Sequence, residues 1–179
     1  MKKIMMTLAA VCVAATMNAQ VWVGGSLGFS TNHTNGNETS TKQFSISPEI
    51  GYNLDENLAV AVELRYAHYN PAVGTNTNSY SIRPYARYTF LKAGNFSVFA
   101  DGGLNYTTTH EQGADNNTNT FGVFVAPGLG YALSEKVCIV AHFGDGLTYN
   151  HRWTKDVTRS NNLGLDLTNG LRFSAYYNF

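Results

Sequence analysis

Charged side chains of opposite sign recur at alternate positions within segments that are otherwise apolar. Carboxylates and guanidinium groups in such surroundings are tolerated only when they pair with one another. The chemistry that these residues predict is therefore ion pairing rather than catalysis. The candidate polar network consists of Glu49, Glu63, Arg83, Arg87, Asp101 and Arg172.

The sequence offers no comparable signal for catalysis or metal binding. None of the five histidines has the close spacing with Cys, Asp or Glu that marks a zinc site. His151, Asp156 and Ser160 have the residue types of a nucleophile, base and acid, but no distinctive motif surrounds them. We therefore expect no enzymatic activity, no cofactor, and no catalytic or metal site.

The end of the chain shows which element positions the charges. Apolar or aromatic side chains occupy every second position at Leu171, Phe173, Ala175, Tyr177 and Phe179. This period of two predicts a β-strand with one apolar face and one polar face.

The same pattern recurs along the chain as two interleaved series. Segments ending in Tyr-x-Leu or Tyr-x-Phe begin at Pro48, Pro84, Pro127 and Phe173, spaced 36, 43 and 46 residues apart. A second series ends at Phe29, Tyr66, Tyr106 and Tyr149. Two series of four predict eight strands in four hairpins. The short connections are expected at 53–57, 91–95 and 134–136, and the long polar ones at 31–41, 70–79, 108–119 and 151–161.

The apolar faces of these strands are typical of a membrane barrel. One strand presents Leu58, Val60, Val62, Leu64 and Tyr66 on one face, and four other strands likewise carry no charge on theirs. A charge at the middle of a bilayer costs a barrel ~2–4 kcal/mol. The sequence therefore predicts strands that face lipid on one side and a polar interior on the other.

Two features depart from this pattern. Pro48, Pro84 and Pro127 each remove a donor from the strand ladder, which predicts a shared bulge or strand end at their level. Regular alternation from 137 to 149 would also place Asp145 on the apolar face. A bulge at Gly144 or Gly146 is expected to turn it inward.

The amino terminus predicts export. Lys2 and Lys3 precede an apolar run that ends before Ala19, which is typical of a secretory signal peptide over 1–19 and leaves a barrel domain over 20–179. The exported part carries ten basic and twelve acidic side chains, so it lacks the positive field needed to bind nucleic acid. It retains one cysteine, Cys138, so no intrachain disulfide forms.

The polar faces define what the interior can do. Regular turns would place Glu63 opposite Arg83, and Asp101 opposite Tyr85. An eight-stranded barrel is just wide enough for its own side chains. The charges therefore predict a static plug of ion pairs, and a gated polar path is the alternative. A wide pore is excluded.

Taken together, the signal, the hairpins and the terminal Phe179 resemble the small eight-stranded outer-membrane barrels: the OmpA transmembrane domain, the OmpX and Ail family, and the Bacteroidota "porin family" proteins. The resemblance implies a monomer in the bacterial outer membrane that contacts lipid and lipopolysaccharide. It also implies folding by the barrel assembly machinery, which would read Leu171, Phe173, Tyr177 and Phe179. The chain stops at Phe179, so we expect no peptidoglycan-binding domain.

Two functions follow as expectations. The first is a structural or surface-interaction role, in which the outer loops meet an extracellular ligand or host surface. Arg152, Trp153 and Lys155 are the candidate loop contacts, because a basic loop with a tryptophan suits phosphate groups or a polymer. The second is a narrow channel for small solutes or ions. A soluble, lipocalin-like barrel is the alternative fold.

Overall fold

The computed structural model describes residues 20–33, 40–154, 158–167 and 171–179; the predicted signal peptide lies outside them. These residues form ten β-strands: β1 (Val21–His33), β2 (Ser40–Asn53), β3 (Leu58–Asn70), β4 (Thr77–Ala93), β5 (Phe96–Glu111), β6 (Thr118–Ala132), β7 (Val137–Phe143), β8 (Gly146–Thr154), β9 (Thr158–Asp166) and β10 (Leu171–Asn178). No helix in the described ranges is long and apolar enough to cross a membrane.

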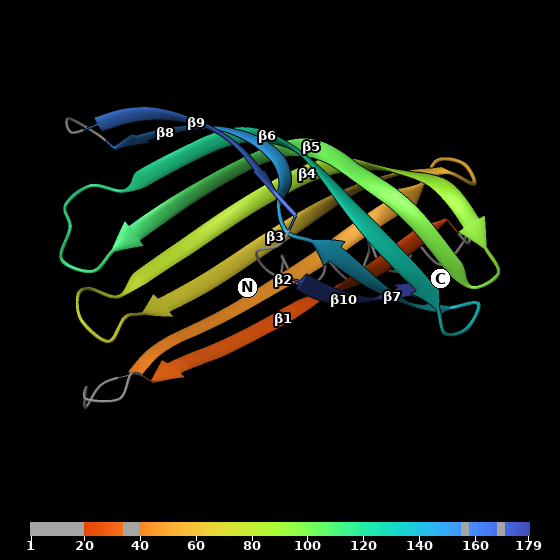
Figure 1. Ribbon diagram of the computed structural model, residues 1–179, viewed down its shortest axis with the longest axis horizontal. Helices are drawn as coiled ribbons and strands as arrows, with labels where there is room; N and C mark the ends of the chain where they lie inside the picture. Colours follow the sequence, from red (N-terminus) through yellow and green to blue (C-terminus); the bar gives the residue numbers. More distant parts are fainter. Residues whose placement is uncertain (1–19, 34–39, 155–157, 168–170) are drawn as a thin grey trace, which may run out of the picture.

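The strands close into an antiparallel barrel, as the sequence predicts. Each strand from β1 to β6 pairs with the next, β6 pairs with β7, β7 with β10, and β10 with β1. Eight strands therefore form the ring, and Figure 1 shows them tilted across one another. The all-β, eight-stranded barrel is confirmed.

The seventh and eighth predicted strands are each divided in two. β7 ends at Phe143 and β8 begins at Gly146, so Gly144 and Asp145 form an insertion opposite β6. Gly144 and Gly146 have φ angles of +59° and +68°, which side chains with a Cβ rarely adopt. The insertion turns Asp145 toward the interior, where it lines cavities together with Arg65. The outer, apolar face of this strand therefore carries no charge from Asp145.

The prolines do not form a shared bulge, contrary to the expectation. Around Pro48 and Pro84 the register is the same before and after the proline, and the ladder is only interrupted for two residues on one side. A two-residue shift occurs beside Pro127, where the Gly144–Asp145 insertion lies. Each proline keeps its pairing with the strand on its other side, opposite Gly25, Val62 and Ala100 respectively, so the missing N–H interrupts only one ladder.

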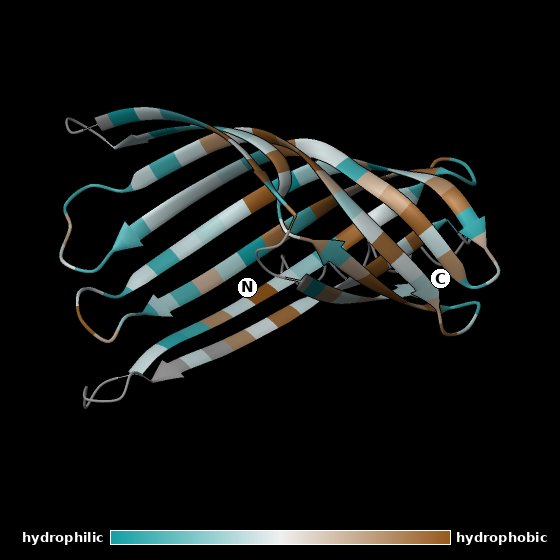
Figure 2. Ribbon diagram, viewed as in Figure 1, coloured by the Kyte–Doolittle hydropathy of each residue, from teal (hydrophilic) through white to brown (hydrophobic). Residues whose placement is uncertain are grey.

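The outer face is apolar along the middle of the barrel. Leu64, Leu104 and Val125 are about half exposed, and Figure 2 shows brown bands alternating with paler ones along the strands. An apolar outer face on a closed sheet is the reverse of a soluble barrel such as a lipocalin. The structure therefore confirms the predicted alternation, in which every second side chain is apolar and faces outward.

The strands extend farther than predicted, so the long-loop connections are shorter. β5 has 16 residues and would rise about 40 Å along the barrel axis, against an apolar band of ~25 Å. Half of the segment expected as a loop at 108–119 is strand, and so are all the described residues of the one at 151–161. Period-two hydrophobicity ends where the sheet leaves the membrane, because both faces are then polar. The ladder itself continues beyond that point.

The ring is closed over only part of its height. β1 pairs with β10 from Trp22 to Gly25, and over the described residues no ladder joins the rest of β1 to β9. In Figure 1 the β8–β9 hairpin and the long-loop end of β1 lie at opposite edges. The backbone seam therefore contributes four residue pairs to closure.

Two of the short turns share one hydrogen-bond pattern. Asp55 Oδ1 accepts the N–H groups of Asn57 and Leu58 at 2.7 and 2.8 Å. In the β6–β7 turn, Ser134 Oγ accepts the corresponding N–H groups of Lys136 and Val137 at 3.3 and 3.1 Å. The two backbone hydrogen bonds lower the pKa of Asp55 below its ordinary 3.8.

The Asp55 turn gives a pH-dependent prediction. A depressed carboxylate pKa stabilises the folded state above the unfolded pKa, and that contribution is lost as the pH falls through the folded pKa. We expect Asp55→Ser to keep the turn, as Ser134 does, and to remove this dependence. Urea unfolding of both forms at pH 7 and pH 3 should show a smaller acid-induced drop in midpoint for the variant; an equal drop would contradict the prediction.

Candidate functional site

A layer of buried side chains crosses the lumen between the two ends of the barrel. This layer, called the plug below, consists of Glu49, Tyr85, Arg87, Phe99, Asp101, His142 and Tyr176. All seven residues are buried, and they come from β2, β4, β5, β7 and β10. Side chains from five strands therefore meet at one level of the barrel.

Arg87 is the centre of the plug. Its Nε and Nη2 atoms donate to Asp101 Oδ1 and Oδ2 at 2.7 and 2.8 Å, a bidentate ion pair. The guanidinium carbon lies 4.1 Å from the centroid of the Phe99 ring. His142 Nε2 lies 2.9 Å from Asp101 Oδ2, so the carboxylate is engaged from two strands. This geometry satisfies a buried charge that would otherwise be costly.

Glu49 is held by hydroxyl groups instead of a cation. Tyr85 and Tyr176 both donate to its Oε2 atom, at 2.7 and 2.9 Å. Arg87 Nη2 lies 3.4 Å from each of these hydroxyl oxygens, which joins Glu49 to the Arg87 ion pair. The plug is thus one connected network.

Inward-facing glycines make room for the aromatic rings of the plug. A Cβ at Gly128 would overlap the Phe99 ring, and one at Gly24 would overlap Tyr176. Trp22 likewise lies against Gly51, and its ring centroid is 4.5 Å from that of Tyr176. Each ring occupies the space that a side chain on the facing strand would need. The rings and glycines together fill the lumen at this level.

A second ion cluster lies on the long-loop side of the plug. Arg172 Nη1 donates to Glu63 Oε1 and Oε2 at 3.1 and 2.9 Å. Arg83 Nη1 is 3.7 Å from Glu63 Oε1, and its guanidinium carbon is 4.1 Å from the centroid of the Phe124 ring. The structure therefore places all six residues of the predicted network in the lumen, in two clusters. Its contribution to stability stays a prediction.

One predicted contact within this network is wrong. Asp101 lies opposite Arg87, and Tyr85 lies opposite Gly103, so the β4–β5 register differs by two residues from the expected one. The β4–β5 turn contains only Gly94 and Asn95, and the register shifts between Thr89 and Leu91. The tighter turn and the bulge move Asp101 directly onto the Arg87 guanidinium. Glu63 lies opposite Arg83, as the hairpin count predicts.

The residues predicted as an assembly signal lie in β10 or just after it. Phe173 and Tyr177 are exposed on the outer face, and Tyr177 makes an edge-to-face contact with Phe179 at 5.2 Å. The backbone of Leu171 pairs with Phe143. β10 is thus the closing strand, and its reading by assembly machinery stays a prediction.

Two of the three candidate loop contacts, Arg152 and Trp153, lie on a strand rather than in a loop. Arg152 is exposed on β8. Trp153 is partly buried, and its ring centroid lies 5.6 Å from that of His151 and 6.4 Å from that of Tyr106. Lys155 lies outside the described residues, as does Asp156. His151 Nδ1 lies 2.7 Å from Asn161 Oδ1, so this ring nitrogen is hydrogen-bonded to the amide oxygen of Asn161.

Cavities remain on both sides of the plug. The one on the short-turn side has a volume of about 280 Å³ and reaches Arg87, Phe99 and Tyr176. The one on the long-loop side has a volume of about 320 Å³ and reaches Arg83 and Phe124. Between them lies a pocket of only about 10 Å³, lined in part by Glu49, Asp101 and His142. The lumen is therefore interrupted at the plug.

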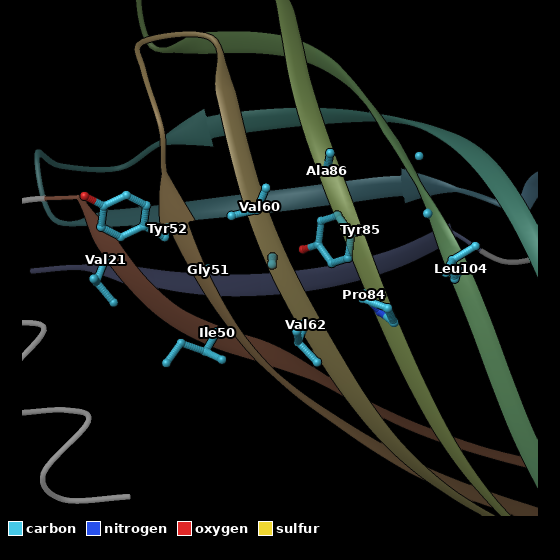
Figure 3. A pocket seen from close by; sticks show the side chains of 13 residues that line it. Val21, Ile50, Gly51, Tyr52, Val60, Val62, Pro84, Tyr85, Ala86 and Leu104 are labelled. Carbon is cyan, nitrogen blue, oxygen red and sulfur yellow. The ribbon is translucent and has the colours of Figure 1, made fainter.

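The largest cavity, about 790 Å³, lies on the outside of the wall. Figure 3 shows Ile50, Val62 and Pro84 side by side on β2, β3 and β4 along this groove. Its lining is almost entirely apolar, so the groove offers no group for chemistry. Acyl chains fill such a surface when the barrel lies in a bilayer.

The predicted network left out three polar residues of the plug: Tyr85, His142 and Tyr176. Each lies on the polar face of its predicted strand, so the period of two in the sequence already indicated that these side chains point inward. Their partners were not, because contacts across a lumen join strands that are not neighbours in the sheet. Tyr176 and Glu49, for example, are 127 residues apart in the sequence.

Comparisons with known proteins agree with this architecture. A family model described as outer membrane protein beta-barrel domain matches residues 4–179. Neisserial surface protein A has a similar structure, with 20% identity, coverage of 90% of this chain and 98% of that chain, and a TM-score of 0.58. OprG from Pseudomonas aeruginosa matches at 10% identity, 89% and 93% coverage, and a TM-score of 0.51. No curated protein sequence matches the chain.

Proposed function

Because the chain belongs to the outer membrane protein beta-barrel domain family and lies in the bacterial outer membrane, we propose that it is a sealed barrel with a structural or surface-interaction role. The observation that carries this proposal is the plug. The pocket between the two lumen cavities has a volume of only about 10 Å³, and Glu49, Tyr85, Asp101 and Arg172 are among the residues that line it. A hydrated ion does not fit through a space of that size.

The strand extensions support a role at the cell surface. β4 and β5 continue past Tyr80 and Tyr106, where the apolar outer face ends, as a paired and hydrogen-bonded wall. Cross-strand hydroxyl pairs hold this wall, with Ser79 and Thr109 at 3.0 Å. A rigid extension presents residues such as Arg152 and Trp153 to lipopolysaccharide or to a host surface. In this proposal the protein acts as a monomer and performs no catalytic step.

Conductance in a planar bilayer tests the proposal. We expect the refolded wild-type barrel, verified by heat-modifiable migration on a gel, to give no discrete current steps. An Arg87→Ser/Phe99→Ala variant removes the guanidinium at the centre of the plug and the ring packed against it, and should conduct, which shows that the assay detects an opened lumen. Reproducible steps from the wild type would contradict the proposal.

A narrow channel is the second candidate, and the paired cavities favour it. Spaces of about 280 and 320 Å³ lie on the two sides of the plug, so a concerted movement of Arg87 and of the Glu63–Arg83–Arg172 cluster would join them. In the same experiment, wild-type steps that disappear in an Arg87→Lys variant would support the channel. Silence in the wild type supports the sealed barrel.

A further inference from the structure

The extracellular half of the lumen contains a cup whose floor is the Glu63–Arg83–Arg172 cluster. Two adjoining cavities of about 320 Å³ each make up the cup, and both are lined by Arg65 and Asp145. Ligand sites in proteins begin at about 300 Å³, so each half suits a molecule of monosaccharide size.

Arg65 is the unusual group in this cup. It lies on β3 opposite Ser81 and faces the lumen, partly buried. Within the described residues, no hydrogen bond or ion pair joins its guanidinium to another side chain. The charges that face it are those of Glu63, Asp145, Arg83 and Arg172. Since Arg172 and Arg83 already share Glu63, Arg65 keeps its planar fork of donors free.

The walls of the cup are lined with hydroxyl and amide groups. Ser81 Oγ and Thr107 Oγ1 are 2.8 Å apart, Thr107 donates to Asn105 at 3.0 Å, and Asn105 donates to Asn150. A hydroxyl has one donor and two acceptor positions, so these groups retain capacity for a ligand. Apolar groups such as Phe124 and Phe173 also line the cup.

Asp145 further restricts the class of ligand that the cup can bind. The Gly144 and Gly146 conformations place its carboxylate in the cup, where it is exposed and forms no ion pair within the described residues. A carboxylate accepts hydrogen bonds from ligand hydroxyls and repels a ligand that brings negative charge alone. The cup thus combines a free cation with an acceptor for hydroxyl groups.

We propose that this cup binds a hydroxylated anion of monosaccharide size, with Arg65 contacting its carboxylate or phosphate group and Asp145 accepting from its hydroxyls. A guanidinium binds either anionic group through two parallel hydrogen bonds. The cup has three guanidinium groups, those of Arg65, Arg83 and Arg172, and two carboxylates, those of Glu63 and Asp145. It therefore carries an excess of positive charge, which an anionic ligand balances. The ligand enters from outside the cell and stops at the Glu63–Arg83–Arg172 cluster.

Titration calorimetry on the refolded barrel at low salt tests this proposal with three matched probes. We expect glucuronate to bind with saturation, glucose to bind at least tenfold more weakly because it lacks the anion, and cyclohexanecarboxylate to bind at least tenfold more weakly because it lacks the hydroxyls. No saturable binding of glucuronate would overturn the proposal. Equal binding of glucuronate and cyclohexanecarboxylate would overturn the role of the hydroxyls.

Variants locate the site. Arg65→Gln should weaken glucuronate binding at least tenfold, whereas Arg159→Gln, with the same charge change on an exposed residue of β9, should leave it within twofold. Equal weakening by both would show a general field effect and overturn the site. Asp145→Asn should weaken glucuronate binding and strengthen that of cyclohexanecarboxylate. Heat-modifiable migration checks folding, and Arg65→Lys, which keeps the charge but loses the fork, replaces Arg65→Gln if the latter does not fold.

Discussion

Replacing Arg87 by methionine is expected to lower the free energy of unfolding of the barrel by about 3–5 kcal/mol, because the substitution leaves Asp101 as an uncompensated buried charge. Methionine keeps much of the side-chain volume, so the loss reports the charge rather than a cavity. The hydrogen bonds from Arg87 to both carboxylate oxygens, at 2.7 and 2.8 Å, are the interactions removed. Urea unfolding in detergent micelles, followed by gel migration, measures the change.

Arg83→Met is the matched control for Arg87→Met. Arg83 is 3.7 Å from Glu63, and Arg172 still engages both Glu63 oxygens in its absence. We therefore expect a loss of only about 1 kcal/mol. An Arg87→Met/Asp101→Leu double variant should recover much of the lost stability, since it removes both charges. Equal losses for the two single variants would contradict the central place of Arg87 in the plug.

Replacing Gly128 by alanine is expected to cost about 1–3 kcal/mol, an effect of overpacking. The new methyl group would overlap the Phe99 ring, and Phe99 is only 2% exposed and already lies against the Arg87 guanidinium. The ring already lies between Gly128 and the Arg87 guanidinium, so either the ring or the β6 backbone must shift. The same unfolding assay measures the change.

Gly102→Ala is the corresponding control on β5. A Cβ at Gly102 would meet its nearest atom, the Phe124 backbone oxygen, at 3.9 Å, an ordinary van der Waals contact. This substitution should be neutral or slightly stabilising, since alanine loses less conformational entropy than glycine on folding. If both alanine variants lost the same stability, glycine content alone, rather than the fit to Phe99, would explain the effect.

The sequence predicted the number of strands, their pairing and the two faces of the wall, because membrane and lumen impose opposite polarity on alternate residues. It also placed Glu63 opposite Arg83 through a regular hairpin. It did not predict the place of Asp101, because the Gly94–Asn95 turn and the bulge near Phe90 change the register without changing the alternation. Register depends on turn geometry, which hydrophobic periodicity does not encode.

The candidate site was predicted less completely than the fold. Composition indicated that inward charges must pair, but the partners of Tyr176 and His142 lie across the lumen, and no local spacing connects them. The cup was not predicted, because Arg65 matters through its lack of a partner, which only three-dimensional placement reveals. The strand extensions were missed for a different reason: a strand that is polar on both faces has the composition of a loop.

The narrow seam between β1 and β10 has a consequence for the order of events during folding. With four backbone pairs at the seam, the ring is also held by cross-lumen contacts such as Glu49 with Tyr176 and Arg87 with Tyr176. These contacts join residues up to 127 positions apart, so they form only after the last strand has arrived. Ring closure and desolvation of the interior are then a single late kinetic step. A nascent chain that lacks β10 remains an open, hydrated sheet.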